Sequence, residues 1–172
     1  MKKELAHTKL TEKVIGCAIS VHKDLGPGFL EKIYEHALCV ELEQQGISYQ
    51  RQMSVPVYYR RKLCGQHRLD LVIENKVILE LKAAKAFEDI HFAIVLSYLK
   101  ASGLPVALLL NFAEPTLAIR RFGNKIFSNG ESRVATGQGR FDQAGERPVQ
   151  VIASHEPGIQ TCSYGGNDMI DA

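Results

Sequence analysis

The segment 67–82 (HRLDLVIENKVILELK) carries charged side chains whose spacing could support chemistry. It predicts two strands joined tightly around Asn75, a turn-forming residue. A turn centred there pairs residues whose numbers sum to about 150, so Asp70 lies opposite Glu80. Lys82 shares their face, because side chains two residues apart point to the same side of a strand. The other face carries an apolar set that should enter the core: Leu69, Leu71, Ile73, Val77, Leu79 and Leu81.

Two carboxylates that face each other across a hairpin repel unless something compensates their charge. A divalent cation such as Mg²⁺ does this well, because it prefers oxygen ligands and is usually held by one or two carboxylates with waters and phosphates. Lys82 could then orient or deprotonate an attacking water, or stabilise charge that develops on a phosphate. The alternative is a plain ion pair of Glu80 with Lys82 on a solvent-exposed strand, with Asp70 merely solvated. The residues alone leave both readings open.

A second group of polar residues follows the sequence Gly26-Pro27-Gly28, at the start of an apolar helical repeat. Gly28, Glu31 and Tyr34 are spaced three residues apart. Glu31, Tyr34 and Glu35 share one helix face, beside the apolar stripe. A glutamate on this face could bring a third carboxylate toward the hairpin. The alternative is a first-turn acid favoured by the helix dipole, next to a core tyrosine.

Basic residues cluster at one further place, where Arg60, Arg61 and Lys62 follow two tyrosines. The run is expected at a tip that connects two strands. There it could contact phosphates together with Arg68. The alternative is a solvated, charged turn, which is the commoner meaning of such a run.

Hydrophobic periodicity places these groups on a mixed set of elements. Repeats at three and four residues predict helices, and apolar alternation predicts half-buried strands. The continuous apolar run at 106–112 predicts a buried strand, and Pro56 marks its own strand as an edge strand or as bulged. The order of elements predicts a mixed α/β layer fold. The expected helices are 10–25, 29–45 and 87–102, and the expected strands are 47–59, 67–74, 76–82, 106–112 and 116–122.

The composition is that of one globular domain. The 172 residues are 45% apolar and 23% charged, which excludes collagen-like, coiled-coil and wholly disordered chains. No apolar stretch is long enough to cross a membrane, and the first residues lack the apolar core of a signal peptide. The four cysteines have no metal-binding spacing. A cytoplasmic protein without a membrane partner is therefore expected.

Charge divides the chain near residue 127. Residues 1–127 carry 18 basic and 13 acidic residues, whereas residues 128–172 carry three and six, together with half of the 14 glycines. Helical and strand periods also fade after this point. We expect a folded domain at 1–127 and a tail at 128–172 that is mostly disordered or loosely attached. A tail that docks as an extra strand is the alternative.

The segment GPGFLEKIYEHAL, with Gly28, Glu31 and Tyr34, resembles the signature of the bacterial GxxExxY proteins. The resemblance continues through RLDLVIENKVILELKA, SYLKASGLPVALLLNF and AIRRF, and so covers roughly residues 8–125. That family looks like a compact branch of the PD-(D/E)xK nuclease superfamily, whose core is a mixed sheet flanked by helices. The resemblance therefore implies a restriction-endonuclease-like α/β fold.

Carried over residue by residue, the resemblance implies a metal-dependent nuclease site. Asp70 would be the acid of the central strand, and Glu80 and Lys82 would form the (D/E)xK pair. Leu81 would lend a backbone carbonyl to Mg²⁺ or Mn²⁺, and Glu31 would be a further acidic ligand. The implied partner is nucleic acid, DNA rather than RNA, and a homodimer is left open.

One position departs from the pattern of this family. Related sequences commonly place a glutamine in the helix after the ExK strand, in a pattern like AQLLxYL, where this chain has Ile94, followed by Tyr98 as a supporting residue. Isoleucine cannot hydrogen-bond to a substrate or a water. Either His91 or Ser97 substitutes for the glutamine, or this copy is weakened. The hypothesis is a metal-dependent phosphodiesterase, and its rival is a nuclease-fold adaptor that binds without cutting.

Overall fold

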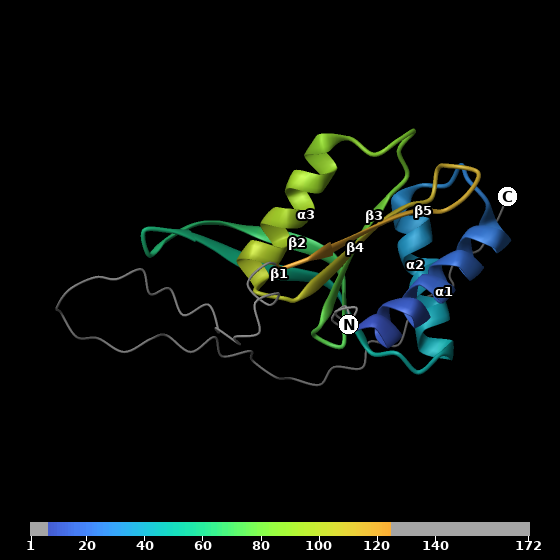
Figure 1. The fold of residues 1–172 in the computed structure, drawn as a ribbon, viewed down its shortest axis with the longest axis horizontal. Helices are drawn as coiled ribbons and strands as arrows, with labels where there is room; N and C mark the ends of the chain where they lie inside the picture. The colour runs from blue at the N-terminus through green and yellow to red at the C-terminus, as the bar shows by residue number, and fades with distance from the viewer. Residues whose placement is uncertain (1–6, 125–172) are drawn as a thin grey trace, which may run out of the picture. The chain divides into compact units, whose positions relative to one another are not determined.

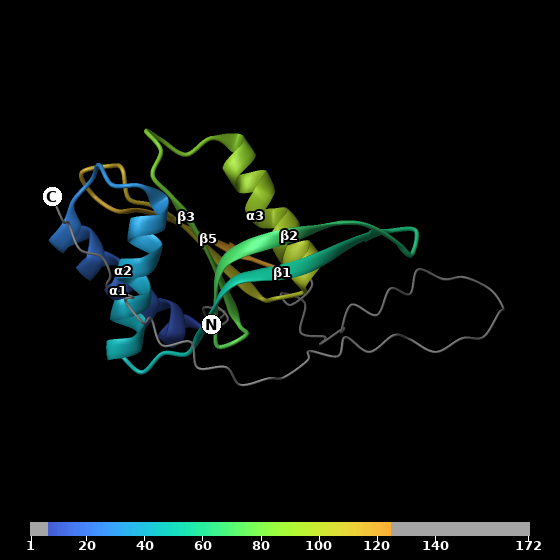
Figure 2. The ribbon, with the colours of Figure 1, turned by 180° about the vertical axis from the view of Figure 1, so that it is seen from behind.

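The computed structural model describes residues 7–124. They form a five-stranded sheet with helices on both faces (Figures 1 and 2). Two helices, α1 (Thr8–Leu25) and α2 (Glu31–Gln44), pack on one face of the sheet, and α3 (Asp89–Ser102) packs on the other. This arrangement confirms the expected α/β fold class.

Two expectations concern the ends of the chain and its surroundings. The domain boundary at residue 127 and the tail at 128–172 lie outside the described residues, so both stay predictions. No helix within the described part is both long and apolar enough to cross a membrane.

The strand order in the sheet is β1-β2-β3-β4-β5. The first three strands, β1 (Tyr49–Tyr59), β2 (Lys62–Ile73) and β3 (Val77–Lys82), are antiparallel neighbours. Helix α3 then carries the chain across to β4 (Val106–Asn111), which lies parallel to β3, and β5 (Ala118–Gly123) is antiparallel to β4. All residues of β4 are buried, as expected for a strand that is covered on both faces.

The edge position of β1 agrees with its proline. Pro56 has no amide hydrogen to donate to a second neighbour, so an edge strand accommodates it. A register shift between Val57 and Tyr58 adds an irregularity directly after it. The strand that contains Pro56 is thus an edge strand, and its pairing is irregular next to the proline, as expected.

The predicted register of the hairpin between β2 and β3 is confirmed near its turn, where Leu71 pairs with Leu79 and Ile73 with Val77. The predicted apolar face is wrong at one position. Leu69 is buried in the cluster beneath α3, whereas the rest of the set packs toward α1 and α2.

The alternation of side chains reverses because of an unusual backbone at Gln52. This residue of β1 has a φ of 51°, a left-handed conformation that residues other than glycine seldom adopt. It precedes Met53, which pairs with Leu69 across the two strands. Because the backbone changes direction at Gln52, the side chains of Met53 and Leu69 point toward α3, while that of Leu71 remains on the α2 side. Asp70 lies at this reversal.

The loop that joins α1 to α2 is held by Tyr34. Its hydroxyl donates to the carbonyl of Gly26 at 2.7 Å and accepts from the amide of Phe29 at 3.1 Å. The ring is fully buried and stacks on Phe112, with 4.5 Å between the centroids. Gly28 in this loop has a φ of 112°, which side chains rarely tolerate. Gly28 and Tyr34 therefore fix where α2 starts, which makes Tyr34 the core tyrosine of the alternative reading.

Asn111, at the end of β4, fixes the loop that follows β3. Its side-chain carbonyl accepts from the amide of Ala84 at 3.0 Å, and its side-chain nitrogen donates to the carbonyl of Ala84 at 2.7 Å. Asn111 has no exposed surface, so these bonds satisfy a buried amide that would otherwise oppose folding. The chain leaving Lys82 is thereby tied to the neighbouring strand.

We predict that Tyr34→Phe lowers the free energy of unfolding by about 1–3 kcal/mol, because the Gly26 carbonyl and the Phe29 amide both lose their partner. Urea unfolding of the full chain measures the change. Tyr58→Phe is the control, since Tyr58 is 62% exposed and its hydroxyl should contribute far less. Equal losses in the two variants would contradict the role given to Tyr34.

Candidate active site

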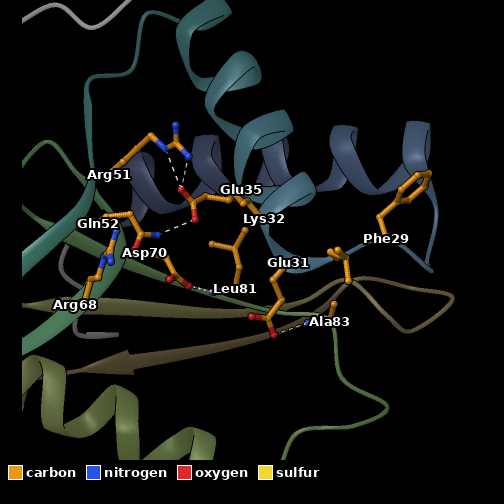
Figure 3. Close-up of a pocket in the computed structure, with 11 residues that line it drawn as sticks. Phe29, Glu31, Lys32, Glu35, Arg51, Gln52, Arg68, Asp70, Leu81 and Ala83 are labelled. Carbon is orange, nitrogen blue, oxygen red and sulfur yellow. Dashed lines mark hydrogen bonds and ion pairs between the residues drawn. The ribbon is translucent and has the colours of Figure 1, made fainter. Parts of the chain in front are cut away.

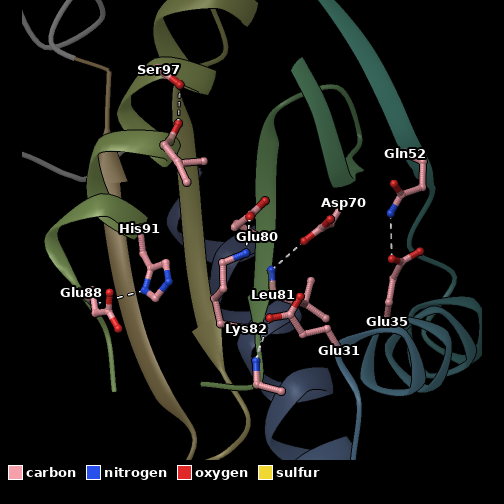
Figure 4. A network of polar contacts seen from close by, with 12 residues as sticks. Glu31, Glu35, Gln52, Asp70, Glu80, Leu81, Lys82, Glu88, His91 and Ser97 are labelled. Atoms are coloured by element: carbon pink, nitrogen blue, oxygen red, sulfur yellow. Dashed lines mark hydrogen bonds and ion pairs between the residues drawn. The ribbon is translucent and has the colours of Figure 1, made fainter. Parts of the chain in front are cut away.

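The acidic residue of β2 lies where the sheet divides. The paired residues of β2 and β3 extend from Ile73 only as far as Leu71, and beyond them the β1–β2 hairpin diverges from β3 (Figure 1). Asp70 lies at this fork, and its Oδ2 accepts a hydrogen bond from the amide of Leu81 at 2.9 Å (Figure 4). The Asp70 side chain thus accepts the Leu81 amide at a point where the backbones of β2 and β3 are no longer paired. This bond holds the carboxylate of Asp70 against β3.

Glu80 and Lys82 extend from β3 close to Asp70. Lys82 Nζ donates to Glu80 Oε1 at 2.6 Å, so the ion pair of the alternative reading does form. The strand is not solvent-exposed, however, because Glu80 is 4% exposed. The second oxygen, Glu80 Oε2, is buried and accepts no hydrogen bond among the described residues. Only a proton shared with Asp70 would link the two carboxyl groups. A buried carboxylate oxygen without a partner is costly, and a cation or a further donor would relieve that cost.

The charges of this group are only partly balanced. Burial, followed by the negative charge of Asp70, raises the pKa of Glu80 to about 7, although Lys82 opposes the shift. Burial also raises the pKa of Asp70, against the opposing effects of the Leu81 amide and Lys82. For Lys82 burial lowers the pKa, but the hydrogen bond to Glu80 and the nearby carboxylates together outweigh it, so the pKa is raised. One ammonium therefore faces two carboxylates in poorly hydrated surroundings.

These donors fit a hard divalent cation. Mg²⁺ takes oxygen ligands and is commonly held by one or two carboxylates, with waters and substrate phosphates as its other ligands. Asp70 and Glu80 provide two carboxylates, and the partnerless oxygen of Glu80 shows where positive charge is lacking. Within residues 7–124, no group of three His, Cys, Asp or Glu side chains is arranged to hold a metal ion. The fit is thus to a two-carboxylate site that water and phosphate complete.

Glu31, the third acid expected from the sequence, reaches this region from the first turn of α2. Its Oε1 accepts from the amide of Ala83 at 3.1 Å, directly after Lys82. The charge of Glu31 also contributes to the raised pKa of Asp70, after burial and the other causes. Helix α2 therefore brings a carboxylate to the end of β3, within electrostatic reach of Asp70.

A cleft of about 760 Å³ opens beside these acids (Figure 3). The first turn of α2 forms one wall, and residues of β1 and β2 form the other. Glu31, Asp70 and Leu81 line the cleft, and so does Arg68, one of the residues expected to contact phosphate. The structure therefore brings Arg68 to the carboxylates.

An ion pair between a buried glutamate and an exposed arginine in the wall of the cleft was not predicted. Glu35 is 6% exposed, and its carboxylate accepts from Arg51 Nη2 at 2.8 Å and from Gln52 Nε2 at 2.8 Å. The sequence offered one signal, namely that Glu35 shares a helix face with Glu31. Its partners could not be identified, because they come from a strand whose backbone is irregular at Gln52. The pair neutralises the charge of Arg51 within the cleft.

Helix α3 closes the other side of the site with Tyr98. Burial, and then the charges of Glu80 and Asp70, raise the pKa of Tyr98 to about 12, so its hydroxyl stays protonated near neutral pH. The ring lies edge-on to His67, with 4.9 Å between the centroids. Tyr98 thus lies within electrostatic reach of both carboxylates, and its supporting role stays a prediction.

The two residues considered as substitutes for the missing glutamine have local partners. Ser97 Oγ donates to the carbonyl of Ile94 at 2.7 Å and lies 3.3 Å from His67 Nε2. His91 Nδ1 accepts from the amide of Glu88 at 3.1 Å, at the start of α3 (Figure 4). Neither residue forms a hydrogen bond with the carboxylates in the described structure.

The remaining basic residues lie far from the carboxylates. Arg60 and Arg61 form the turn between β1 and β2, and Lys62 begins β2. The expected position at a strand-connecting tip is therefore confirmed. Figure 2 shows this tip at the far end of the hairpin from α1 and α2.

Comparison with known proteins adds the family. Among solved structures, the chain is similar to the crystal structure of SSO0001, with 14% identical residues and a TM-score of 0.45; the match covers 68% of this chain and 58% of that one, less than two thirds of its length. No curated protein matches the chain significantly. The GxxExxY branch stays a prediction. Residues 8–122, which contain all four acids and the lysine discussed above, match the model of the PD-(D/E)XK nuclease superfamily, and the chain belongs to that superfamily.

Proposed function

We propose that the chain hydrolyses phosphodiester bonds of nucleic acid at the site formed by Asp70, Glu80 and Lys82. The observation that carries the proposal is the buried, partnerless oxygen of Glu80 beside a second carboxylate and a lysine. The two carboxylates carry more negative charge than one lysine offsets. A divalent cation would offset the remainder and could bind a substrate phosphate at the same time. Membership of a nuclease superfamily supports the same class of reaction.

Asp70 and Glu80 would hold Mg²⁺ or Mn²⁺, with water and the substrate phosphate as the other ligands. Glu31 and the backbone carbonyl of Leu81, the further ligands expected from the sequence, stay predictions. When bound, the cation supplies Lewis acidity at the phosphate and offsets the charge of the carboxylates. The Leu81 amide keeps Asp70 in place, and the Ala83 amide keeps Glu31 at the edge of the cleft. Carboxylates that are held in advance lose little freedom when they bind.

Lys82 acts as a donor in this proposal. Its raised pKa keeps the amine protonated at neutral pH, and the bond to Glu80 fixes its direction. A protonated amine can orient the attacking water and stabilise negative charge on the phosphate, but it cannot accept a proton. Of the roles considered for Lys82, the proposal assigns orientation of the water and stabilisation of negative charge.

Arg68 would hold the sugar–phosphate backbone next to the scissile bond. It lines the cleft together with Asp70, and its guanidinium has no carboxylate partner among the described residues. Arginine suits this contact because its planar fork of donors matches phosphate oxygens. DNA rather than RNA as the substrate, a cytoplasmic location and a homodimer stay predictions.

A second candidate function, binding without cleavage, is favoured by one observation. Ile94 replaces the glutamine of related sequences, and both neighbouring substitutes, His91 and Ser97, are engaged in bonds of their own. In this reading the chain is an adaptor that holds nucleic acid. Metal binding and cleavage distinguish the two functions.

Removal of the Lys82 ammonium should abolish most cleavage. We expect Lys82→Ala to lower the rate by about 100-fold or more, because developing charge on the phosphate loses its donor. The measurement uses the full chain with Mg²⁺ or Mn²⁺ and a panel of single-stranded, duplex and branched DNA and RNA.

Lys76→Ala is the matched control for this experiment, because Lys76 lies on the same hairpin and forms an exposed ion pair with Glu74. Its activity should equal that of the wild type. If the wild-type chain cleaves no substrate faster than Lys82→Ala, the proposed reaction is wrong.

Calorimetry with Mn²⁺ tests the metal site without any substrate. We expect binding by the wild-type chain and at least about tenfold weaker binding by Asp70→Asn, because one of the two carboxylates that would hold the ion is lost. Glu74→Gln removes an exposed carboxylate from the same hairpin and should leave the affinity unchanged. Equal affinity in Asp70→Asn and the wild type would place the ion elsewhere.

The raised pKa of Glu80 predicts how the stability of the metal-free chain depends on pH. The ordinary pKa of 4.5 applies to the unfolded chain, whereas the folded chain keeps the proton up to about 7. The folded state therefore binds more protons in this interval, and stability falls as the pH rises through it. The expected loss is about 2–3 kcal/mol, measured by urea unfolding at pH 5 and pH 8 with a chelator present.

Glu80→Gln serves as the comparison, because glutamine resembles the protonated acid and cannot ionise. The variant should lose little stability over the same interval and should exceed the wild type at pH 8. Added Mn²⁺ should then stabilise the wild type and not the variant. A decline of equal size in both proteins would assign the pH dependence to other groups.

A further inference from the structure

The outer part of the β1–β2 hairpin, residues 54–68, extends away from the helices and the other strands (Figures 1 and 2). We call this segment the hairpin arm. Only its base is packed against the domain, where Val55 is buried in the cluster beneath α3. Toward the tip, Tyr58, Tyr59 and Leu63 are 62%, 65% and 64% exposed. The sheet therefore carries a two-stranded ribbon that its own core does not require.

The hairpin arm carries charge of one sign. It contains Arg60, Arg61, Lys62 and Arg68 and no Asp or Glu. None of these four residues forms an ion pair within the described part of the chain. The Arg60 guanidinium lies over the ring of Tyr59, 5.3 Å from its centroid. The arm thus presents cations and aromatic rings, the combination that binds nucleic-acid backbones and bases.

The backbone of the turn argues against a merely solvated loop. Arg60 and Arg61 have φ values of 46° and 66°, and two-residue hairpin turns of this kind favour Asn-Gly because other residues are strained there. A left-handed conformation costs a residue with a Cβ about 1 kcal/mol or more. Solubility alone is served equally well by Asn and Gly. The turn thus presents two arginines where the backbone favours Asn and Gly.

The arm and the proposed site share one strand. Arg68 lines the cleft two residues before Asp70 on β2, and Arg61 lies nine residues before Asp70. At about 3.3 Å per residue, the turn lies at most about 30 Å from Asp70. Duplex DNA rises 3.4 Å per base pair, so this length corresponds to about nine base pairs. A two-stranded ribbon also has the width that the major groove of DNA admits.

We propose that the hairpin arm binds duplex DNA up to about nine base pairs from the phosphate held at Asp70. The proposal rests on the function proposed above, and it adds a second contact that sets a minimum substrate length. Duplexes that reach only the cleft bind through Arg68 and the site. Duplexes that also reach the tip gain the contacts of Arg60, Arg61 and Lys62.

The test compares DNA affinity at two duplex lengths, 8 and 24 base pairs, in a Glu80→Gln background so that no strand is cut. The arm variant is R60A/R61A/K62A. On the long duplex we expect about 10- to 100-fold weaker binding near 0.1 M salt and a salt slope smaller by about 2–3. On the short duplex the two proteins should differ by less than about threefold.

K9A/K13A/K23A is the matched control, because it removes the same charge from exposed positions of α1, at the opposite end of the domain (Figure 1). Equal losses in the arm variant and this control would overturn the proposal, and so would the absence of salt-dependent binding by the parent protein. A larger loss on a single-stranded 24-mer than on the duplex would overturn the choice of duplex DNA. Binding is read without cleavage, so a wild-type chain that binds but never cuts refutes the proposed hydrolysis alone.

Cross-linking measures the position of the arm directly. Cys64 on the arm is exposed, whereas Cys17 and Cys39 are buried, so a thiol-linked photoreactive group attached in a Cys162→Ser variant marks the arm. We expect adducts to one side of the cleavage position, up to about nine base pairs from it. Adducts spread evenly along the duplex, or none at all, would contradict the proposed placement.

Discussion

The structure depends on keeping two carboxylates and one ammonium together at a buried fork of the sheet. Burial opposes the ionised forms of Asp70 and Glu80, and the two acids also repel each other. Their positions must therefore be imposed by the surrounding chain. Strand β3, which is buried by helices on both faces, does this for Glu80 and Lys82, and the Leu81 amide does it for Asp70.

The segment with Gly28, Glu31 and Tyr34 follows from the same requirement. Tyr34 and Gly28 fix the loop before α2. This places the Glu31 carboxylate where it accepts a hydrogen bond from the amide of Ala83. Asn111, at the end of β4, accepts a hydrogen bond from the amide of Ala84, the residue that follows Ala83 in the loop after β3. The chain leaving Lys82 is thus fixed from two elements that are distant in sequence. The two readings of this segment are compatible, because Tyr34 packs in the core while Glu31 reaches the site.

Local patterns in the sequence were sufficient for the order of the elements and for the hairpin register next to the turn. They missed the first part of β2, which begins at Lys62 and not at the expected residue 67. The pairing of Leu71 with Leu79 follows from a turn at Asn75, since a tight turn leaves the strands one register. The position of Leu69 did not follow, because the left-handed backbone of Gln52 on the adjacent strand reverses the alternation. The ion pair of buried Glu35 with Arg51 could not be predicted either. Both depend on contacts between strand β1 and its neighbours that no period within one segment encodes.

The loss of folding stability caused by the buried, ionised Glu80 helps to decide between a nuclease and an adaptor. A module that only bound DNA would need cations on its surface, which the hairpin arm and Arg68 provide, and would gain nothing from a buried Glu80 whose ionisation opposes folding. Glutamine at position 80 would keep the shape and remove the cost. Ile94 affects contacts to substrate or water, whereas the charge deficit at Glu80 Oε2 concerns a cation. The acids therefore favour the proposed cation-dependent reaction over the adaptor, and the change at Ile94 would affect the rate of that reaction.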